Sequence, residues 1–239
     1  VTVLLVDETG DGPELRRVIG LARERGATVL GVTNRLGSYL TRMARVYVCQ
    51  HSGPPLGVKP LRTFTSQALV LAQLAIRIAE LRGKIGHVEM EEYQEALSAV
   101  PSLIEETIRM ASPVAEEVAR KYADRRFFFV LGRGVGYPTA LEGVRLLMEV
   151  AGVAGLSYPA GESKHGPISL VEEGFPVVFV CQMDETHGDV KGNMKEMEAR
   201  GANIIAVAEE GDEEVKAIAH DIIPVPVSYT HLRAHETEA

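Results

Sequence analysis

One pattern occurs twice in the chain. Residues 1–34 read VTVLLVDETGDGPELRRVIGLARERGATVLGVTN, and residues 176–210 read PVVFVCQMDETHGDVKGNMKEMEARGANIIAVAEE. Each copy runs from an apolar stretch through Asp-Glu-Thr and a helix-like segment to Arg-Gly-Ala and a second apolar stretch. Two tripeptides that recur in register favour an internal duplication, so the fold has to hold the same strand–helix–strand unit in two places.

Short β-branched runs alternate with helix-like periodicity along most of the chain. Examples of such runs are ATVLGVT at 27–33 and FFFVLG at 127–132. Strands that are apolar almost throughout are typical of parallel sheets whose two faces are both covered. We therefore predict an α/β fold with parallel sheets and helices on both faces.

The second copy is preceded by a strand, a glycine turn and a helix that have no counterpart before the first copy. We therefore expect two domains, 1–84 and 85–227, with the first incomplete, and a chain truncated at both ends. The last segment, 228–239, is polar and aperiodic, and we interpret it as a non-native tail. It contains His231 and His235, four residues apart, but without a third histidine or cysteine beside them and without an apolar face, so we predict no metal site.

Two helical segments carry specific expectations. Apolar residues cover most of the circumference of 63–82, so we predict a largely buried helix there. The segment 89–125 has an amphipathic pattern, and we expect breaks near Pro101 and Pro113, because proline removes a helix hydrogen bond.

The net charge and the composition restrict the classes of partner that the protein can bind. The net charge of −8 and the pI of about 5.5 argue against nucleic acid or anionic membranes as general partners. We find no apolar run close to the roughly 20 residues that span a bilayer. Cys49 and Cys181 each end an apolar run and are predicted to be buried, reduced cysteines, so we expect a cytoplasmic protein.

Two stretches of the second half could carry chemistry. In GRGVGYPTALEG a glycine turn joins a strand to a helix, which can hold an anion but is often only structural. On that helix Glu142 and Glu149 stand two turns apart and share one face. The loop YPAGESKHGP, 158–167, places three titratable side chains between glycines and prolines, which restrict its backbone.

Both stretches resemble sequence motifs of a known protein family. ALEGVRLLMEVAGVAGLSYPAGESKHGP, at 140–167, resembles the sugar isomerase (SIS) domains of glutamine–fructose-6-phosphate transaminases, which read A-L-E-G and A-G-E-x-K-H-G-P. GVKPLRTFTSQ, at 57–67, resembles a second segment of that family. The resemblance implies tandem flavodoxin-like SIS domains, each with a parallel sheet.

The resemblance also implies roles for individual residues. Glu149 stands at the position of the catalytic glutamate, which moves a proton between C1 and C2 of an open-chain sugar phosphate. His165 stands at the position of the ring-opening histidine, which is contributed to the neighbouring subunit's site and so implies a homodimer. The implied phosphosugar-binding residues are Thr9, Gly10, Val58, Glu142 and Lys164. No cofactor and no metal are implied.

Some positions depart from the family pattern. Asp7 and Gly12 replace hydroxyl-bearing residues of the phosphate loop, Pro60 replaces a serine or threonine, and Leu146 replaces a lysine. No glutaminase domain is recognised in the chain. Two hypotheses follow: a sugar-phosphate isomerase module of an aminotransferase-like protein, or a non-catalytic sugar-phosphate-binding regulatory module.

Overall fold

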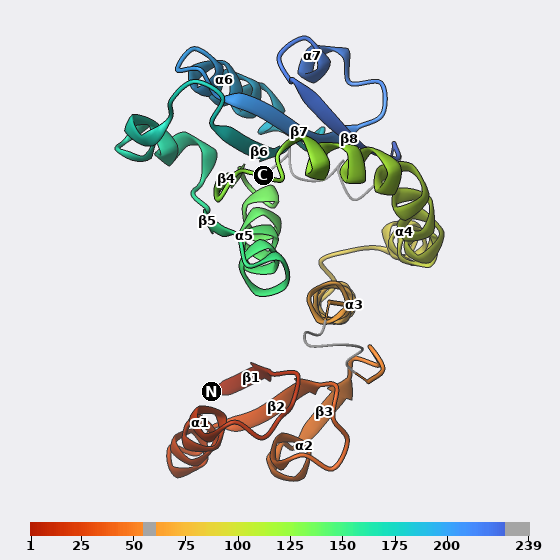
Figure 1. The fold of residues 1–239 in the computed structure, drawn as a ribbon. Coiled ribbons are helices and arrows are strands. Elements are labelled where there is room, and N and C mark those ends of the chain that lie inside the picture. The colour runs from red at the N-terminus through yellow and green to blue at the C-terminus, as the bar shows by residue number, and fades with distance from the viewer. Residues whose placement is uncertain (55–60, 228–239) are drawn as a thin grey trace. The chain divides into compact units, whose positions relative to one another are not determined.

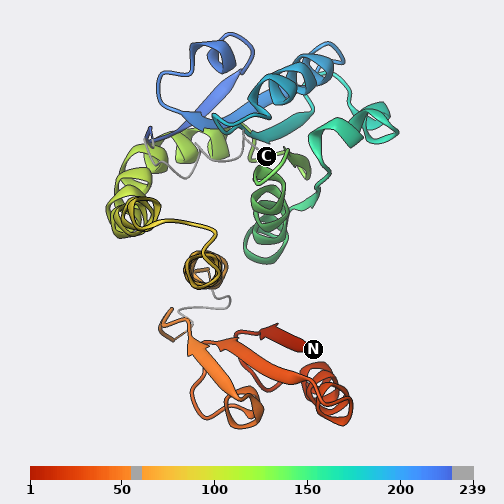
Figure 2. The same cartoon turned by 180° about the vertical axis from the view of Figure 1, so that it is seen from behind.

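The structure, a computed structural model, describes residues 1–54 and 61–227. The chain divides into two compact units, Val1–Tyr93 and a second that begins at Gln94 (Figures 1 and 2). This division falls inside a helix, nine residues beyond the limit expected at 84. The predicted domain limits stay predictions, and the expected tail at 228–239 lies outside the described residues.

The first unit is built on a parallel sheet of order β1-β2-β3. Helices α1 and α2 lie on the same side of this sheet (Figure 1). Ile19, Val29 and Leu40 form its buried centre, where both helices meet β2. On the other side Leu4 and Val6 of β1 are exposed. The elements are β1 Thr2–Val6, α1 Pro13–Glu24, β2 Thr28–Thr33, α2 Tyr39–Met43 and β3 Val46–Cys49.

Helix α3, Thr63–Leu81, differs from the expectation in its burial. None of its residues is buried, and Ile78 and Leu81 are 51% and 70% exposed. The apolar surface is therefore real, but the described residues do not cover it. The helix is also long and apolar enough to cross a membrane by length and composition alone, with a hydropathy of 1.2, contrary to our reading of the sequence. One such helix is weak evidence for a membrane span.

The second unit contains a five-stranded sheet in which every neighbouring pair is parallel. Its order is β5-β4-β6-β7-β8, which in chain order is 2-1-3-4-5, the flavodoxin-like order. Its main elements are the larger part of α4 His87–Lys121, from Gln94 onward, and β4 Phe127–Gly132, α5 Gly136–Leu146, β5 Ala154–Leu156, β6 Pro176–Val180, α6 His187–Glu198, β7 Asn203–Glu209, α7 Glu213–Lys216 and β8 Asp221–Val225. A π turn, η1 Leu147–Ala151, and two 3-10 turns, η2 Ala160–Lys164 and η3 Pro167–Leu170, complete it.

Both faces of this sheet are covered, as predicted. Alternate residues of each strand point to opposite faces. Phe129 and Leu131 pack with residues of α6 and α7 in the largest core cluster. Val130 packs against α5, and Ile205 packs against the end of α4. The predicted α/β fold with parallel sheets is thus confirmed.

The duplicated segments adopt the same order of elements. β1, α1 and β2 correspond to β6, α6 and β7, and both strand pairs are parallel. The third strand, β3 or β8, lies beside the second in each sheet. The predicted tandem arrangement is consistent with this order.

Helix α4 corrects one expectation. It runs without a break over 35 residues and contains both Pro101 and Pro113. The helix ribbon is bent rather than straight (Figures 1 and 2). A proline inside a helix removes one backbone donor and pushes the preceding turn aside, and bending is a common way of absorbing it.

Candidate functional site

The loop after β1 is closed by its own aspartate. Asp7 Oδ1 accepts hydrogen bonds from the backbone N–H of Gly10 at 2.5 Å and from the hydroxyl of Thr9 at 3.0 Å. Thr9 and Gly10 are the two residues of this loop that the resemblance assigns to the phosphosugar. Asp7, which replaces a hydroxyl-bearing residue of the family's phosphate loop, thus binds the donors of its own loop through its carboxylate.

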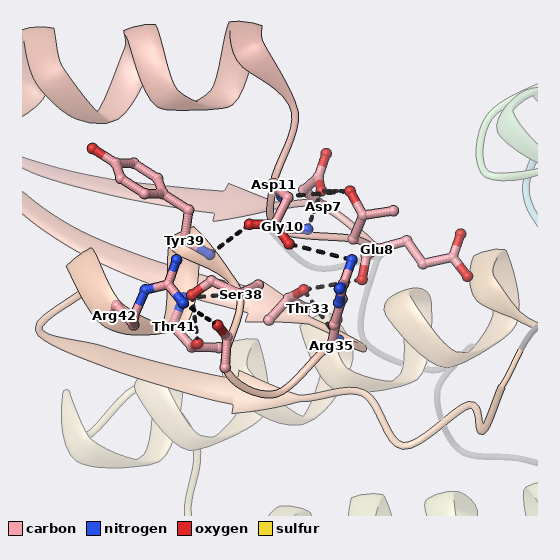
Figure 3. Close-up of polar contacts among 12 residues, drawn as sticks. Asp7, Glu8, Gly10, Asp11, Thr33, Arg35, Ser38, Tyr39, Thr41 and Arg42 are labelled. Atoms are coloured by element: carbon pink, nitrogen blue, oxygen red, sulfur yellow. Dashed lines mark hydrogen bonds and ion pairs between the residues drawn. The ribbon is translucent and has the colours of Figure 1, made fainter.

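Several further contacts fix this loop (Figure 3). The carbonyl of Glu8 accepts from Asn34 N and from the Thr33 hydroxyl, each at 3.0 Å. The Asp11 carboxylate accepts from Tyr39 N at 2.8 Å. Gly10 has φ +66°, and a side chain there would collide with Ser38, so only glycine fits. The loop is therefore held against the segment that follows β2.

A cavity of about 540 Å³ opens beside this loop in the first unit. It lies at the carboxyl ends of parallel strands, where α/β proteins bind ligands. Thr9, Arg35 and His51 line it. His51 has φ +51° and, apart from glycines, is the one residue of the described chain with a positive φ. Such backbone strain is enriched at functional sites, although it does not establish one.

A related turn occurs in the second unit, where the aspartate again binds the hydroxyl of the threonine two residues on but accepts from a different backbone N–H. Asp184 Oδ1 accepts from the backbone N–H of Thr186 at 2.8 Å and from its hydroxyl at 2.7 Å. Nearby, His187 and Asp212 form a largely buried pair at 2.7 Å. Burial, and after it the negative charge of Asp212, raises the pKa of the Cys181 thiol to about 12. Cys181 is buried as predicted, and Cys49 is half-buried; both are free thiols.

Glu149 lies on the π turn η1 that follows α5. Both Glu149 and Glu142 bind the same guanidinium, that of Arg145. Arg145 Nε donates to Glu142 Oε2 at 2.7 Å, Nη2 donates to Glu142 Oε1, and Nη1 donates to Glu149 Oε2. The predicted common face of the two glutamates is thus present, and a residue that we had not singled out joins them. π turns are frequent at functional sites.

The loop that carries His165 packs beside the end of β4. Pro159 bridges to Gly132, and a side chain at Gly161 would lie 2.9 Å from Arg133 Nη1. Ser163 is buried and its hydroxyl donates to the Ala160 carbonyl at 2.6 Å. His165 is exposed at the end of η2, and Lys164 Nζ lies 3.7 Å from Glu196 Oε1.

The structure brings the predicted residues together in pairs. Thr9 and Gly10 meet at Asp7, and Glu142 and Glu149 meet at Arg145, whereas Lys164 is paired with Glu196. Val58 and Pro60 lie outside the described residues. In the described part of the chain, no group of three or more His, Cys, Asp or Glu side chains is arranged to hold a metal ion.

Sequence reasoning missed Arg145, Arg35 and His51. A signal existed for Arg145, because it stands three residues after Glu142 and four before Glu149, the spacings of helical ion pairs. Arg35 and His51 stand two residues after the ends of β2 and β3, and ligand sites in parallel sheets lie at the carboxyl ends of the strands.

Comparison with known proteins gives one consistent result. The model of the SIS domain matches residues 1–77 and 121–233. A glutamine–fructose-6-phosphate aminotransferase (isomerizing) from Pyrobaculum aerophilum is 40% identical over 215 residues, which are 90% of this chain and 35% of that protein. A protein of the same name from Thermus thermophilus is 36% identical over 223 residues, 93% of this chain and 37% of its own length. The chain thus spans roughly a third of these relatives.

Solved structures share the fold. The C-terminal domain of glucosamine–fructose-6-phosphate aminotransferase from Francisella tularensis superimposes with a TM-score of 0.89 at 24% identity, covering 96% of this chain and 65% of that one. A tagatose-6-phosphate ketose/aldose isomerase from Escherichia coli gives a TM-score of 0.66 at 20% identity, covering 96% of this chain and 61% of the other. At these identities the structures support the fold alone.

Proposed function

Because this chain belongs to the SIS domain family, we propose that it is the ketose–aldose isomerase module of an aminotransferase-like protein. The proposed substrate is a sugar phosphate of the fructose 6-phosphate or glucosamine 6-phosphate type. The observation that carries the proposal is Glu149: its side chain is 29% exposed, and it lies on a π turn, at the position that matches the catalytic glutamate of the family. The aminotransferase relatives support the same substrate class.

The proposed chemistry needs one base that acts at two carbon atoms. Glu149 removes a proton from C1 of the open-chain ketose, and the electron pair forms the C1–C2 double bond of an enediol while the C2 oxygen takes a proton. Return of the proton to C2, with loss of the hydroxyl proton at O1, gives the aldose. Proton transfer by a positioned carboxylate supplies about 10² to 10⁴ in rate and needs no cofactor.

His165 is proposed to open the sugar ring in the site of a neighbouring copy. Its exposure is compatible with such a role, and an imidazole can exchange protons near neutral pH. Thr9, Gly10, Val58, Glu142 and Lys164 are proposed to contact the substrate. A homodimer in the cytoplasm is part of this proposal.

Solvent-deuterium incorporation into C1 or C2 of fructose 6-phosphate tests the proposal. The Glu149→Gln variant keeps the size of the side chain but removes the base, so we expect incorporation to fall by at least about a hundredfold. Glu198→Gln, an exposed glutamate on α6, is the control and should incorporate deuterium like the wild type. Equal incorporation by wild type and Glu149→Gln would exclude this residue as the base.

One observation favours a second function, a non-catalytic sugar-phosphate-binding module. Asp7 engages the donors of Thr9 and Gly10 within the loop, so the loop departs from the family pattern and holds a phosphate less firmly, which suits weak binding better than turnover. Such a module would bind fructose 6-phosphate without incorporating deuterium into it. Calorimetric titration beside the exchange assay separates the two functions.

A further inference from the structure

The guanidinium of Arg145 binds two carboxylates. Its Nε and Nη2 both donate to Glu142, one to each carboxylate oxygen, while Nη1 donates to Glu149. A planar guanidinium that binds a carboxylate through two parallel N–H groups is fixed in orientation as well as in position. Glu142 therefore sets the direction in which Arg145 presents its remaining nitrogen to Glu149.

The environment makes this arrangement tighter than an ordinary surface pair. The side chain of Glu142 is 16% exposed and that of Arg145 is 38% exposed. Ala140 and Val144 of helix α5 pack against the sheet, so the backbone that carries Glu142 and Arg145 is anchored. A network of several charges with fork geometry holds better than isolated exposed pairs, which contribute little.

A restraint on the orientation of the side chain matters most for Glu149, because this residue lies where the regular α-helix ends. The α-helical part stops at Leu146, and Glu149 sits within the π turn 147–151, closed by Gly152 at φ +65°. A carboxylate that takes a proton from one carbon and returns it to the next must keep its direction to within roughly 10–20°. The contact with Arg145 supplies that restraint from the regular part of the helix.

We propose that Arg145 is a positioning residue, which is anchored by Glu142 and orients Glu149 for proton transfer between C1 and C2 of the sugar. This inference rests on the proposed role of Glu149 as the base. The bidentate anchor requires arginine, since a lysine ammonium is a point charge that cannot form the same fork. Glu142 then acts through Arg145 as well as by any contact with the substrate.

The test measures kcat and KM for deuterium incorporation into fructose 6-phosphate by four proteins: wild type, Arg145→Gln, Arg145→Lys and Glu142→Gln. We expect Arg145→Gln to lower kcat by about ten- to a hundredfold with KM changed by less than about threefold, because an interaction that aligns the base acts on the chemical step. Arg145→Lys should recover part of the loss. Arg120→Gln, which removes a similar pair with Glu116 in α4, should leave both constants unchanged.

A double variant tests whether Glu142 acts on kcat through Arg145. If Glu142 acts through Arg145, then Glu142→Gln combined with Arg145→Gln should be no slower than Arg145→Gln alone. Losses in kcat that multiply, a wild-type kcat for Arg145→Gln, or a change in KM alone for Arg145→Gln would each overturn the inference. Melting temperatures identify a variant that has lost its fold, and Arg145→Lys keeps the test decisive in that case.

The outcome also separates this inference from the proposed function. Loss of incorporation in Glu149→Gln together with a fully active Arg145→Gln would refute the positioning role and leave the base in place. Retained incorporation in Glu149→Gln would refute both.

Discussion

At the scale of single residues, Asp7 decides how the first loop meets an anion. Its carboxylate holds the Gly10 N–H and the Thr9 hydroxyl, and no cationic side chain of the described residues forms an ion pair with it. Asp11, four residues on, is by contrast within 3.7 Å of Arg16 and 3.5 Å of Arg35. Asp7 is thus a loop carboxylate whose charge no cation of the described residues offsets, unlike that of Asp11.

We predict that Asp7→Ser raises the affinity for fructose 6-phosphate by about tenfold, because it removes a repulsive charge and releases two donors. Isothermal titration calorimetry measures the change. Asp184→Ser, which opens the related turn in the second unit, should leave the affinity unchanged. Unaltered binding by Asp7→Ser would show that the phosphate does not approach this loop.

Part of the candidate site could be predicted from the sequence. The shared face of Glu142 and Glu149 follows from helix periodicity and is present. The contacts of Asp7 could not be predicted from the sequence. An aspartate next to a glycine loop can face a ligand or close its own turn, and the backbone angles decide which of the two occurs. The part of the chain around Val58 is not described, so its role stays a prediction.

At the scale of elements, one carboxylate joins the end of α4 to β8. Asp221 accepts from the Tyr122 hydroxyl at 2.8 Å and from Lys121 Nζ at 2.7 Å. Tyr122 is 4% exposed, so its hydroxyl has little access to water, whereas Lys121 is half-exposed. The hydrogen bond to Asp221 raises the pKa of Lys121.

We predict that Asp221→Ala lowers the free energy of unfolding by about 2 kcal/mol, because it leaves a buried hydroxyl without its acceptor. Lys121→Ala should cost less than about 1 kcal/mol, as expected for a pair that water reaches. Urea unfolding followed by circular dichroism gives both values. Equal losses in the two variants would contradict the importance of the tyrosine.

The elements show where sequence patterns are sufficient and where they fail. The strands and their parallel pairing were predictable, because continuous apolar runs between helices leave few alternatives. The burial of α3 was not predictable, since periodicity shows that a surface is apolar but not what covers it. The continuity of α4 through two prolines was also missed, because a helix can bend instead of ending.

At the scale of the whole molecule, the proposed site requires two copies. If Glu149 and His165 of one site come from different subunits, two inactive variants can complement each other. We predict that mixing Glu149→Gln with His165→Ala, after reversible dissociation, restores incorporation to about a quarter of wild type, since half of the dimers are mixed and each has one intact site. Each variant alone should stay inactive.

Two outcomes would contradict a site shared between subunits. No recovery, with mixed dimers verified by mass spectrometry, would place both residues of a site on one subunit. A strictly monomeric mass in solution would exclude the shared site altogether. The wild type taken through the same dissociation step gives the reference activity.

The π turn at 147–151 has a consequence for how this helix tolerates change. A turn of this kind contains one residue more than the surrounding α-helical spiral, and each residue of that spiral swings the next side chain by about 100° around the axis. A single-residue deletion between Arg145 and Glu149 would let the spiral become regular at little cost to its stability, yet it would swing the acidic group to a different side. The number of residues at this point is therefore as constrained as the identity of Glu149, and substitutions at the intervening positions 146–148 should be better tolerated than single-residue insertions or deletions.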